Sequence, residues 1–310
     1  MAVDDRLADT GGLGIVRILL AGVLIFSGFP ASASAEKLTL TDSHNRVYQA
    51  SVPVQRVVSL SPHITELFFA AGAGDLLVGV VDFSDFPEAA KQLPRIGDAF
   101  RVDLEKVALL KPDLVAVWES GTPVALQEKL VQLGIPIFSF EVGELDGIAD
   151  DLERVGRLTG RRASAKSVAN HYRKELSKLR LNNHDKKKLS FFYQISARPL
   201  FTVNGRHFIS EVLELCGGVN IFDELQSLAP TVAIESVIER DPQVIVAGRF
   251  PGMSENPLAQ WQRFPTLNAV STDNLYLVNA ELVARSTPRI ISGITEACQV
   301  MDEARSKILQ

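Results

Sequence analysis

The chain has 310 residues, which is enough for one large or two ordinary domains. Its hydrophobic fraction of 46% and charged fraction of 22% are typical of a soluble globular protein. The formal net charge of −5, with no basic stripe interleaved with aromatic residues, argues against a general nucleic-acid binder.

The N-terminus has the pattern of an export signal. Residues 14–29 form an apolar run broken by Arg17, and small residues follow at 31–35. This pattern predicts a signal peptide over residues 1–35, cleaved near Ala35–Glu36, and a periplasmic mature protein. The acidic residues Asp4 and Asp5 are atypical of the charged region that begins a signal peptide, and a misplaced start codon would explain them. The alternative is a retained membrane anchor, although the unbroken run after Arg17 is shorter than the ~20 residues that span a bilayer.

Residues 36–160 alternate strands with helices and are predicted to form an N-terminal lobe. A hairpin is expected near 38–48, strands at 56–60, 77–81, 114–117 and 135–140, and a further strand and loop at 95–100. Helices are expected from Pro62, with Ser61 as N-cap, and at 104–110, 124–133 and 145–158, with Gly160 as the last C-cap. The strands are nearly continuous apolar runs, which favours a parallel sheet covered on both faces.

A long helix is predicted between the two halves of the chain, within residues 161–185. Apolar residues over 163–181 recur at spacings of three and four, and these are Ala165, Val168, Ala169, Tyr172, Leu176 and Leu179. A helix of this length would measure about 28 Å.

Residues 186–310 resume the alternating pattern and are predicted to form a C-terminal lobe. Strands are expected at 189–195, 244–247 and 275–278, the last of them as a central strand. Helices are expected at 207–215 and 234–239, and a C-terminal helix capped by Thr287-Pro288 is expected to run to about Leu309.

The two halves resemble each other in sequence. LEKV at 104–107 followed by KPDLVAV at 111–117 matches IESV at 234–237 followed by DPQVIVA at 241–247. A weaker match pairs ELFFAAG at 66–72 with EVLELCG at 211–217. In the first match a proline lies seven positions after the glutamate in both copies. We therefore predict an α/β protein of two lobes, each a mainly parallel sheet flanked by helices, joined by one long backbone helix.

The chain has only two cysteines, Cys216 and Cys298, both in the predicted C-terminal lobe. In an oxidising compartment such a pair favours a disulfide between the helix at 210–215 and the C-terminal helix. Two buried free thiols are the alternative. A metal site is disfavoured, because no Cys or His lies at ligand spacing from either cysteine.

The sequence offers no catalytic constellation. The zinc-protease, nucleophile-elbow, phosphate-loop and dinucleotide-binding patterns are all missing from the mature chain. The five histidines are scattered, and His63, the one on a predicted cleft loop, is interpreted as a polar residue at a helix start. We therefore expect a binding protein rather than an enzyme, with no cofactor and no bound metal.

Five segments resemble the periplasmic substrate-binding proteins with a helical backbone that serve ABC importers for cobalamin, haem and siderophores. They are RVVSLSPHITEL at 56–67, VGVVDFSDFP at 78–87, LLKPDLV at 109–115, VLELCGGVNIF at 212–222 and RSTPRII at 285–291. The resemblance covers essentially the whole mature chain and is nearest to the cobalamin-binding branch. In that branch a disulfide falls at the positions of the two cysteines.

The resemblance implies a monomer that holds a corrinoid between its lobes and docks on a permease dimer. The ligand-contacting positions correspond to Phe83, Trp118, Phe201, Glu281 and Arg285. The docking glutamates correspond to Glu105 and Glu235, one on each lobe. As carboxylates in the first turn of a helix, they are also expected to interact favourably with the helix dipole.

Two positions depart from the cobalamin binders, which commonly have tryptophans where this chain has Ala99 and Ala229. Phe100 is a candidate substitute for the first, and the ligand is expected to be cobalamin or another corrinoid such as a cobinamide. A ferric siderophore would need clustered arginines, for which Arg198, Arg206, Arg249 and Arg285 are available, and haem would need an axial ligand such as Tyr193. A ferric-siderophore or haem binding protein is therefore the alternative, and an exported enzyme is the alternative of a different class.

Overall fold

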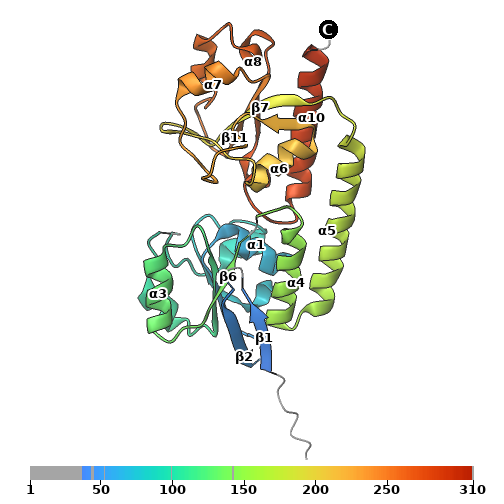
Figure 1. The fold of residues 1–310 in the computed structure, drawn as a ribbon. Helices are drawn as coiled ribbons and strands as arrows, with labels where there is room; N and C mark the ends of the chain where they lie inside the picture. Colours follow the sequence, from blue (N-terminus) through green and yellow to red (C-terminus); the bar gives the residue numbers. More distant parts are fainter. Residues whose placement is uncertain (1–36, 43–44, 52, 99, 142, 309–310) are drawn as a thin grey trace, which may run out of the picture. The chain divides into compact units, whose positions relative to one another are not determined.

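The computed structural model describes residues 37–308, apart from 43–44, 52, 99 and 142. The predicted signal peptide, Ala99 and Leu309 lie outside the described residues. None of the described helices combines the length and the hydropathy that crossing a bilayer requires. The described part has two four-stranded sheets, each flanked by helices (Figure 1), which confirms the predicted fold class.

The N-terminal sheet has the strand order β4-β3-β5-β6, and every pair is parallel. Its strands are β3 (Val57–Ser59), β4 (Leu77–Val80), β5 (Leu114–Trp118) and β6 (Ile137–Phe140). The first four residues of β5 are buried, as expected for a central strand with helices on both faces. The antiparallel hairpin of β1 (Lys37–Thr41) and β2 (Val47–Ser51) precedes the sheet.

Four helices accompany this sheet. They are α1 (Pro62–Ala70), α2 (Leu104–Leu109), α3 (Val124–Gln132) and α4 (Gly147–Thr159). Gly160 ends α4 in the left-handed conformation at φ 73°, as predicted for its C-cap. Ser61 is the N-cap of α1, as predicted, although its hydroxyl bonds Nδ1 of His63 and caps no backbone N–H.

A correction concerns the described residues 95–98 and 100, which are not part of any assigned strand. Their segment makes isolated bridges, between Val80 and Arg95 and between Gly97 and Val102. Gly97 has φ 106°, and a Cβ there would lie 2.1 Å from the carbonyl oxygen of Arg101. The backbone therefore turns at Gly97 and leaves the sheet.

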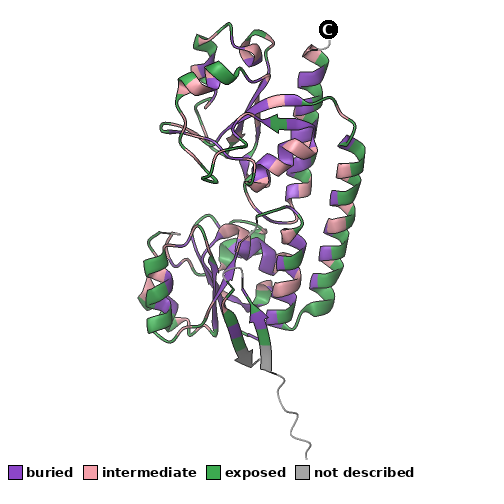
Figure 2. Cartoon of the chain, in the orientation of Figure 1, coloured by how far each residue is buried: buried purple, intermediate pink, exposed green. Residues whose placement is uncertain are grey.

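Helix α5 (Arg162–Asn183) has 22 residues, about 33 Å, and follows α4 directly. Its buried residues include Ala165, Ala169, Tyr172 and Leu176, and they lie along one side of the helix (Figure 2), as the apolar spacing predicts. The Tyr172 hydroxyl donates to the carbonyl oxygen of Leu145, 2.8 Å away, just before α4. This apolar face of α5 therefore packs along α4.

The C-terminal sheet has the order β10-β7-β11-β12 and is also all parallel. Its strands are β7 (Leu189–Gln194), β10 (Gly218–Asn220), β11 (Val244–Arg249) and β12 (Leu275–Asn279). Strand β12 lies at the edge and not in the centre, because β11 takes the place between it and β7. A short ribbon, β8 (Ser196–Ala197) with β9 (Leu200–Phe201), follows β7.

The helices of this part are α6 (Phe208–Leu215), α7 (Ile234–Arg240), α8 (Asn268–Ser271), α9 (Ala280–Val283) and α10 (Ile290–Ile308). The two sheets have the same strand order. In each sheet the strand that comes second in the chain lies at one edge, and the first, third and fourth strands follow it across the sheet. Lys111 and Asp241, which precede the matching prolines, both have positive φ, 45° and 42°. The sequence repeat therefore corresponds to two lobes of the same topology.

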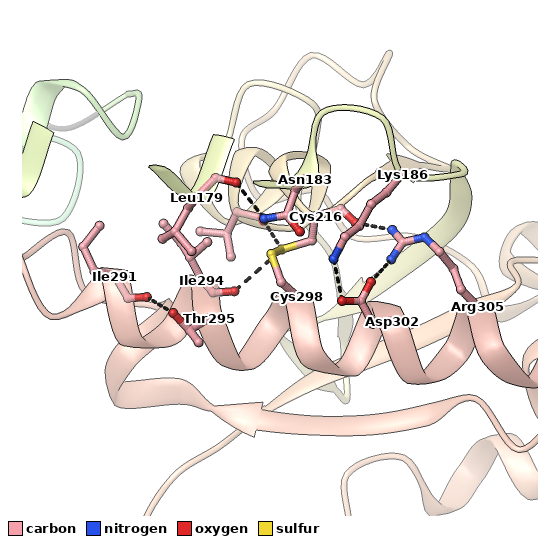
Figure 3. Close-up of a disulfide and its surroundings, with 11 residues drawn as sticks. Leu179, Asn183, Lys186, Cys216, Ile291, Ile294, Thr295, Cys298, Asp302 and Arg305 are labelled. Atoms are coloured by element: carbon pink, nitrogen blue, oxygen red, sulfur yellow. Dashed lines mark hydrogen bonds and ion pairs between the residues drawn. A yellow bond between two sulfur atoms is a disulfide. The ribbon is translucent and has the colours of Figure 1, made fainter. Parts of the chain in front are cut away.

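The disulfide between Cys216 and Cys298 is formed, which excludes the free-thiol alternative. It joins the end of α6 to α10 across a sequence separation of 82 residues (Figure 3). Beside it, Arg305 of α10 donates to the carbonyl oxygen of Cys216 and pairs with Asp302, and Lys186 pairs with the same aspartate. The α6–α10 contact is thus held by a covalent bond and by an ionic network.

Asp151 of α4 carries a testable consequence for stability. The Asp151 side chain is fully buried, and its Oδ1 lies 2.5 Å from a guanidinium nitrogen of Arg154. Burial raises the pKa of this carboxyl from 3.8 to about 7. Between these values the folded protein keeps a proton that the unfolded chain releases, so stability falls as pH rises. Asp151→Asn should remove this loss, which is about 4 kcal/mol at most, and should be more stable than wild type above pH 7.

Urea unfolding at a series of pH values measures this difference. The matched control is Glu128→Gln, because Glu128 is an exposed carboxylate on α3 of the same lobe. The control should leave the pH profile as in wild type. If the free energies of unfolding of wild type and Asp151→Asn changed in parallel between pH 4 and 7, the Asp151 carboxyl would not be protonated in the folded protein over that range.

Candidate functional site

Loops at the carboxyl ends of the parallel strands carry most of the expected ligand-contacting residues. In a parallel sheet these ends lie on the same edge, so the loops that follow them come together there. Phe83 follows β4, Trp118 ends β5 and Glu281 follows β12. The site is therefore assembled from loops that the sheets hold in place.

Trp118 is the best-supported aromatic of the N-terminal lobe. Its backbone N–H donates to Oγ1 of Thr122, and its ring meets His63 edge-on at 5.2 Å between centroids. A Cβ at Gly121 would lie 1.9 Å from the indole, so only glycine fits against this ring. The indole remains 37% exposed although it is held on two sides, which suits a surface that stacks on a flat ligand.

His63 packs edge-on against the ring of Trp118. Its Nδ1 lies 2.6 Å from Oγ of Ser61, and burial, with a smaller contribution from the charge of Arg285, lowers its pKa to about 3. The imidazole is therefore neutral at physiological pH. The interpretation of His63 as a polar residue at a helix start agrees with its position, and its contact with Trp118 adds a structural role.

Phe83 and Phe100 are the most exposed aromatic side chains among the expected contacts, at 71% and 75%. Phe83 has φ 64°, an uncommon value for a bulky residue, so the local backbone holds the ring outward. Asp98 accepts the backbone N–H groups of Phe100 and Arg101 and closes the turn that presents Phe100. Exposed rings held by such turns are available to an apolar partner.

In the C-terminal lobe the structure brings Glu281 and Arg285 together, whereas Phe201 lies in a short β-ribbon. Glu281 lies in the first turn of α9, where its N–H donates to Oδ1 of the N-cap Asn279, and its carboxylate lies 3.4 Å from Arg285. Phe201 is part of β9, is partly buried and pairs with Ser196 through the backbone. Within the described residues, neither Phe201 nor Phe100 makes a ring contact with another expected ligand residue.

A charged cluster that the sequence did not reveal lies beside these residues. Glu66 of α1 is 3% exposed, and its Oε1 accepts from Arg285 at 2.7 Å and from Arg289 at 3.1 Å. Arg285 also donates to the carbonyl oxygen of Phe83 at 3.3 Å, and the guanidinium of Arg289 lies 3.7 Å from the centre of the Phe86 ring. One buried carboxylate of the first lobe thus holds two arginines of the second.

A pocket of about 270 Å³ adjoins this cluster. Its lining residues are Glu66, Phe69, Ala70, Phe86, Pro87, Thr287, Pro288 and Arg289. Two buried polar atoms of the lining, Oε2 of Glu66 and Oγ1 of Thr287, have no hydrogen-bond partner in the described part of the chain. Thr287 therefore makes no capping bond, and α10 begins only at Ile290.

The expected docking residues occupy equivalent positions in the two lobes. Glu105 lies in the first turn of α2 and Glu235 in the first turn of α7, and both are exposed. Neither takes part in an ion pair over the ranges that the structure covers. Two free carboxylates at matching places suit a partner with two similar halves.

The arrangement has the features of a binding surface. No group of three or more Cys, His, Asp or Glu side chains within the described residues could hold a metal ion. Exposed aromatic rings beside paired arginines and glutamates suit a large ligand with an apolar face and polar edges.

Comparisons with known proteins agree with this geometry. Residues 57–282 match the family described as periplasmic binding protein. The vitamin B12-binding protein of Vibrio campbellii (strain ATCC BAA-1116) is 36% identical over 258 residues, which are 83% of this chain and 93% of that protein. The corresponding protein of Yersinia pestis (strain Pestoides F) is 36% identical over 247 residues, covering 80% and 86% of the two chains.

Solved structures give the same result. The periplasmic vitamin B12 binding protein BtuF of Vibrio cholerae is 36% identical with a TM-score of 0.74, covering 82% of this chain and 98% of that one. The periplasmic haem-binding protein RhuT from Roseiflexus sp. RS-1 has a TM-score of 0.69 at 20% identity, over 81% and 98% of the chains, and shows the fold alone. The chain therefore belongs to the periplasmic binding protein family, in the group that includes the vitamin B12-binding proteins.

Proposed function

We propose that this protein captures cobalamin or a related corrinoid between its lobes and delivers it to an ABC importer. The observation that carries the proposal is the exposed indole of Trp118, held edge-on by His63 at the carboxyl end of β5. A rigid aromatic face of this kind can stack on a flat macrocycle at little entropic cost. The 36% identity to vitamin B12-binding proteins over nearly their whole length supports the same ligand.

The proposed ligand contacts are Phe83, Phe100, Trp118, Phe201, Glu281 and Arg285. Phe100 would take the place of a tryptophan that cobalamin binders commonly have where this chain has Ala99. Ala229 has no evident substitute, which leaves room for a cobinamide as well as cobalamin. Glu105 and Glu235 are the proposed contacts with the two halves of an importer permease.

The proposal includes the setting in which the protein acts. The protein is exported through residues 1–35, works in the periplasm as a monomer and transports its ligand without converting it. Its lobes are residues 36–160 and 186–310, joined by the backbone helix within 161–185. The two-lobed fold and the membership of a family of binding proteins support this assignment.

A ferric-siderophore or haem binding protein is the second candidate, and one observation weighs against haem. Tyr193, the tyrosine nearest the expected cleft, is only 3% exposed within β7. Its hydroxyl lies close to the backbone at Gly248, and burial raises its pKa. This tyrosine is therefore not available as an axial ligand to iron.

Isothermal titration of the purified mature protein with cyanocobalamin, haem and a ferric hydroxamate siderophore tests the proposal. Cyanocobalamin should bind at least 100-fold more tightly than the other two, an affinity gap of about 3 kcal/mol. Tighter binding of haem or siderophore, or chemical conversion of the bound corrinoid, would overturn the proposed function.

Trp118→Ala should weaken corrinoid binding by about 10- to 100-fold, because removing a stacked aromatic typically costs 1–3 kcal/mol. The matched control is Trp261→Phe, which changes the other tryptophan, a fully buried residue of the second lobe. The control should retain wild-type affinity once its folding has been checked by circular dichroism. Equal affinity of Trp118→Ala and wild type would remove Trp118 from the site.

A further inference from the structure

Arg46, the residue before β2, joins the N-terminal hairpin to the loop that presents Trp118. Within the hairpin, its Nε donates to Oδ2 of Asp42 at 2.9 Å, and its backbone N–H donates to Oδ1 of the same carboxylate at 2.9 Å. Asp42 is buried, so these two bonds orient the guanidinium from the side of the hairpin.

The other donors of the Arg46 guanidinium meet three side chains around the carboxyl end of β5. Nη2 donates to Oε2 of Glu119 at 3.0 Å and to Oγ of Ser139, and Nη1 donates to Oε1 of Gln127 at 3.2 Å. Glu119 follows β5, Ser139 belongs to β6 and Gln127 belongs to α3. One guanidinium thus connects a loop, a strand and a helix at this place.

Two of these contacts lead directly to Trp118. Glu119 is the next residue in the chain, and Gln127 is buried and donates through Nε2 to the carbonyl oxygen of Thr122 at 3.1 Å. Thr122 bonds Trp118 twice, since its Oγ1 accepts the Trp118 N–H at 3.1 Å and its own N–H donates to the Trp118 carbonyl oxygen at 2.7 Å. Arg46 therefore holds the turn that carries the indole at both of its ends.

The hairpin that carries Arg46 is itself packed on the lobe. Leu40 of β1 and Tyr48 of β2 are buried, and the Tyr48 ring meets the ring of Phe138 in β6 edge-on at 5.8 Å between centroids. The hairpin therefore lies against the β6 side of the sheet (Figure 1). Because core contacts fix the hairpin, Arg46 is held at its base and is not a mobile surface charge.

The exposed indole of Trp118 gains from such support. A side chain that is mobile in the free protein must be ordered when a ligand stacks on it, and this ordering reduces the affinity. A turn that is already held before the ligand arrives avoids part of that cost.

We propose that Arg46 is a positioning residue for the ligand site, because it holds the turn of residues 118–122 and so keeps the indole of Trp118 in place in the free protein. Arg46 acts through Trp118 and not by contact with the ligand. The inference rests on the proposed function, which assigns the Trp118 ring to the face that stacks on the ligand.

The first experiment needs no ligand. With Trp261→Phe as the parent protein, Trp118 is the only tryptophan, so the fluorescence reports the mobility of its ring. Arg46→Ala should raise the rate constant for acrylamide quenching by about 2-fold or more and should lower the fluorescence anisotropy. Arg46→Lys keeps the charge but loses the planar fork of donors, so its values should lie between those of Arg46→Ala and the parent.

Arg56→Ala is the matched control, because Arg56 is another arginine of the N-terminal lobe that ties two segments together. It precedes β3, and its Nε donates to the carbonyl oxygens of Leu110 and Lys111, at 3.0 and 3.2 Å, before β5 begins. These bonds lie at the amino ends of the parallel strands, at the edge opposite to Trp118. The control should leave the Trp118 fluorescence and the ligand affinity as in the parent, and circular dichroism checks the folding of each variant.

The second experiment measures cyanocobalamin binding by calorimetry in a double-mutant cycle. Arg46→Ala should weaken binding by about 3- to 10-fold, the range expected when the ligand has to order one exposed side chain. Combined with Trp118→Ala, the same change should weaken binding by less than about 2-fold, because the ring through which Arg46 acts is gone. A general structural defect would weaken binding equally with and without Trp118.

Equal quenching and anisotropy in Arg46→Ala and the parent would overturn the positioning role, and so would an equal loss of affinity with and without Trp118. If Arg46→Ala does not fold, Arg46→Lys takes its place in both experiments, and unchanged fluorescence and affinity in that variant would overturn the inference. An absence of any cyanocobalamin binding by wild type would instead overturn the proposed function, while the fluorescence comparison would still decide whether Arg46 positions Trp118.

Discussion

Replacing both cysteines by alanine is expected to lower the free energy of unfolding by about 4 kcal/mol. The Cys216–Cys298 bond closes a loop with a sequence separation of 82 residues, and a loop of this size restricts the unfolded chain by that amount in the chain-entropy description. The corresponding fall in Tm is about 10 °C for a protein of this size. Guanidinium unfolding under oxidising conditions measures the difference.

Two further samples separate the covalent bond from the packing around it. Cys216→Ala alone should match the double variant, because the remaining Cys298 has no partner with which to form a bond. Wild type unfolded and refolded with a reductant should also match it. A loss smaller than 1 kcal/mol in all three samples would mean that packing and the Arg305 contacts hold α10 on α6 without the bond.

Removing both proposed docking carboxylates, Glu105→Ala with Glu235→Ala, is expected to abolish productive contact with an ABC importer while sparing ligand binding. Truncating one partner of a hydrogen-bonded interface charge pair costs 2–5 kcal/mol, so losing both should lower stimulation of importer ATPase at least 30-fold. Each carboxylate stabilises its own helix by only about 0.3–1 kcal/mol, so folding should be retained. The ATPase of the importer in proteoliposomes, with loaded binding protein added, measures the effect.

The chain offers a matched control for this change. Glu128 on α3 and Glu239 on α7 are exposed glutamates, one on each lobe, and replacing both by alanine removes the same net charge. This control should stimulate the importer as wild type does, and each single docking variant should fall between wild type and the double variant. Equal loss in the control and docking variants would show that net charge, and not position, governs docking.

The periodicity of the sequence was sufficient to predict most of the fold. Continuous apolar strands indicated two covered parallel sheets, and the spacing over residues 163–181 indicated the face that α5 buries. The errors concerned a local turn and the order of strands. Gly97 turns the backbone where a strand was expected, and β11 takes the central place that was expected for β12.

The site was predicted less completely, because its charged centre depends on contacts far apart in the chain. Glu66 and Arg285 are separated by 219 positions, and nothing in their neighbours indicates that they pair. A weak signal was present in the repeat, which aligned Glu66 with Glu211. In the structure each of these glutamates contacts the other half, since Glu211 accepts the N–H of Leu145 at 2.6 Å and pairs with Arg180 at 2.8 Å.

Buried residues of both lobes belong to one hydrophobic cluster, which runs from the first sheet through α4, α5 and α6 to α10. Two smaller clusters fill only the outer faces of the sheets. Swinging one lobe away from the other would bring part of the shared cluster into water, and each 200 Å² of it exposed would cost about 5 kcal/mol. That is comparable to the whole stability of a typical domain, so the shared cluster opposes any motion that separates the two sheets.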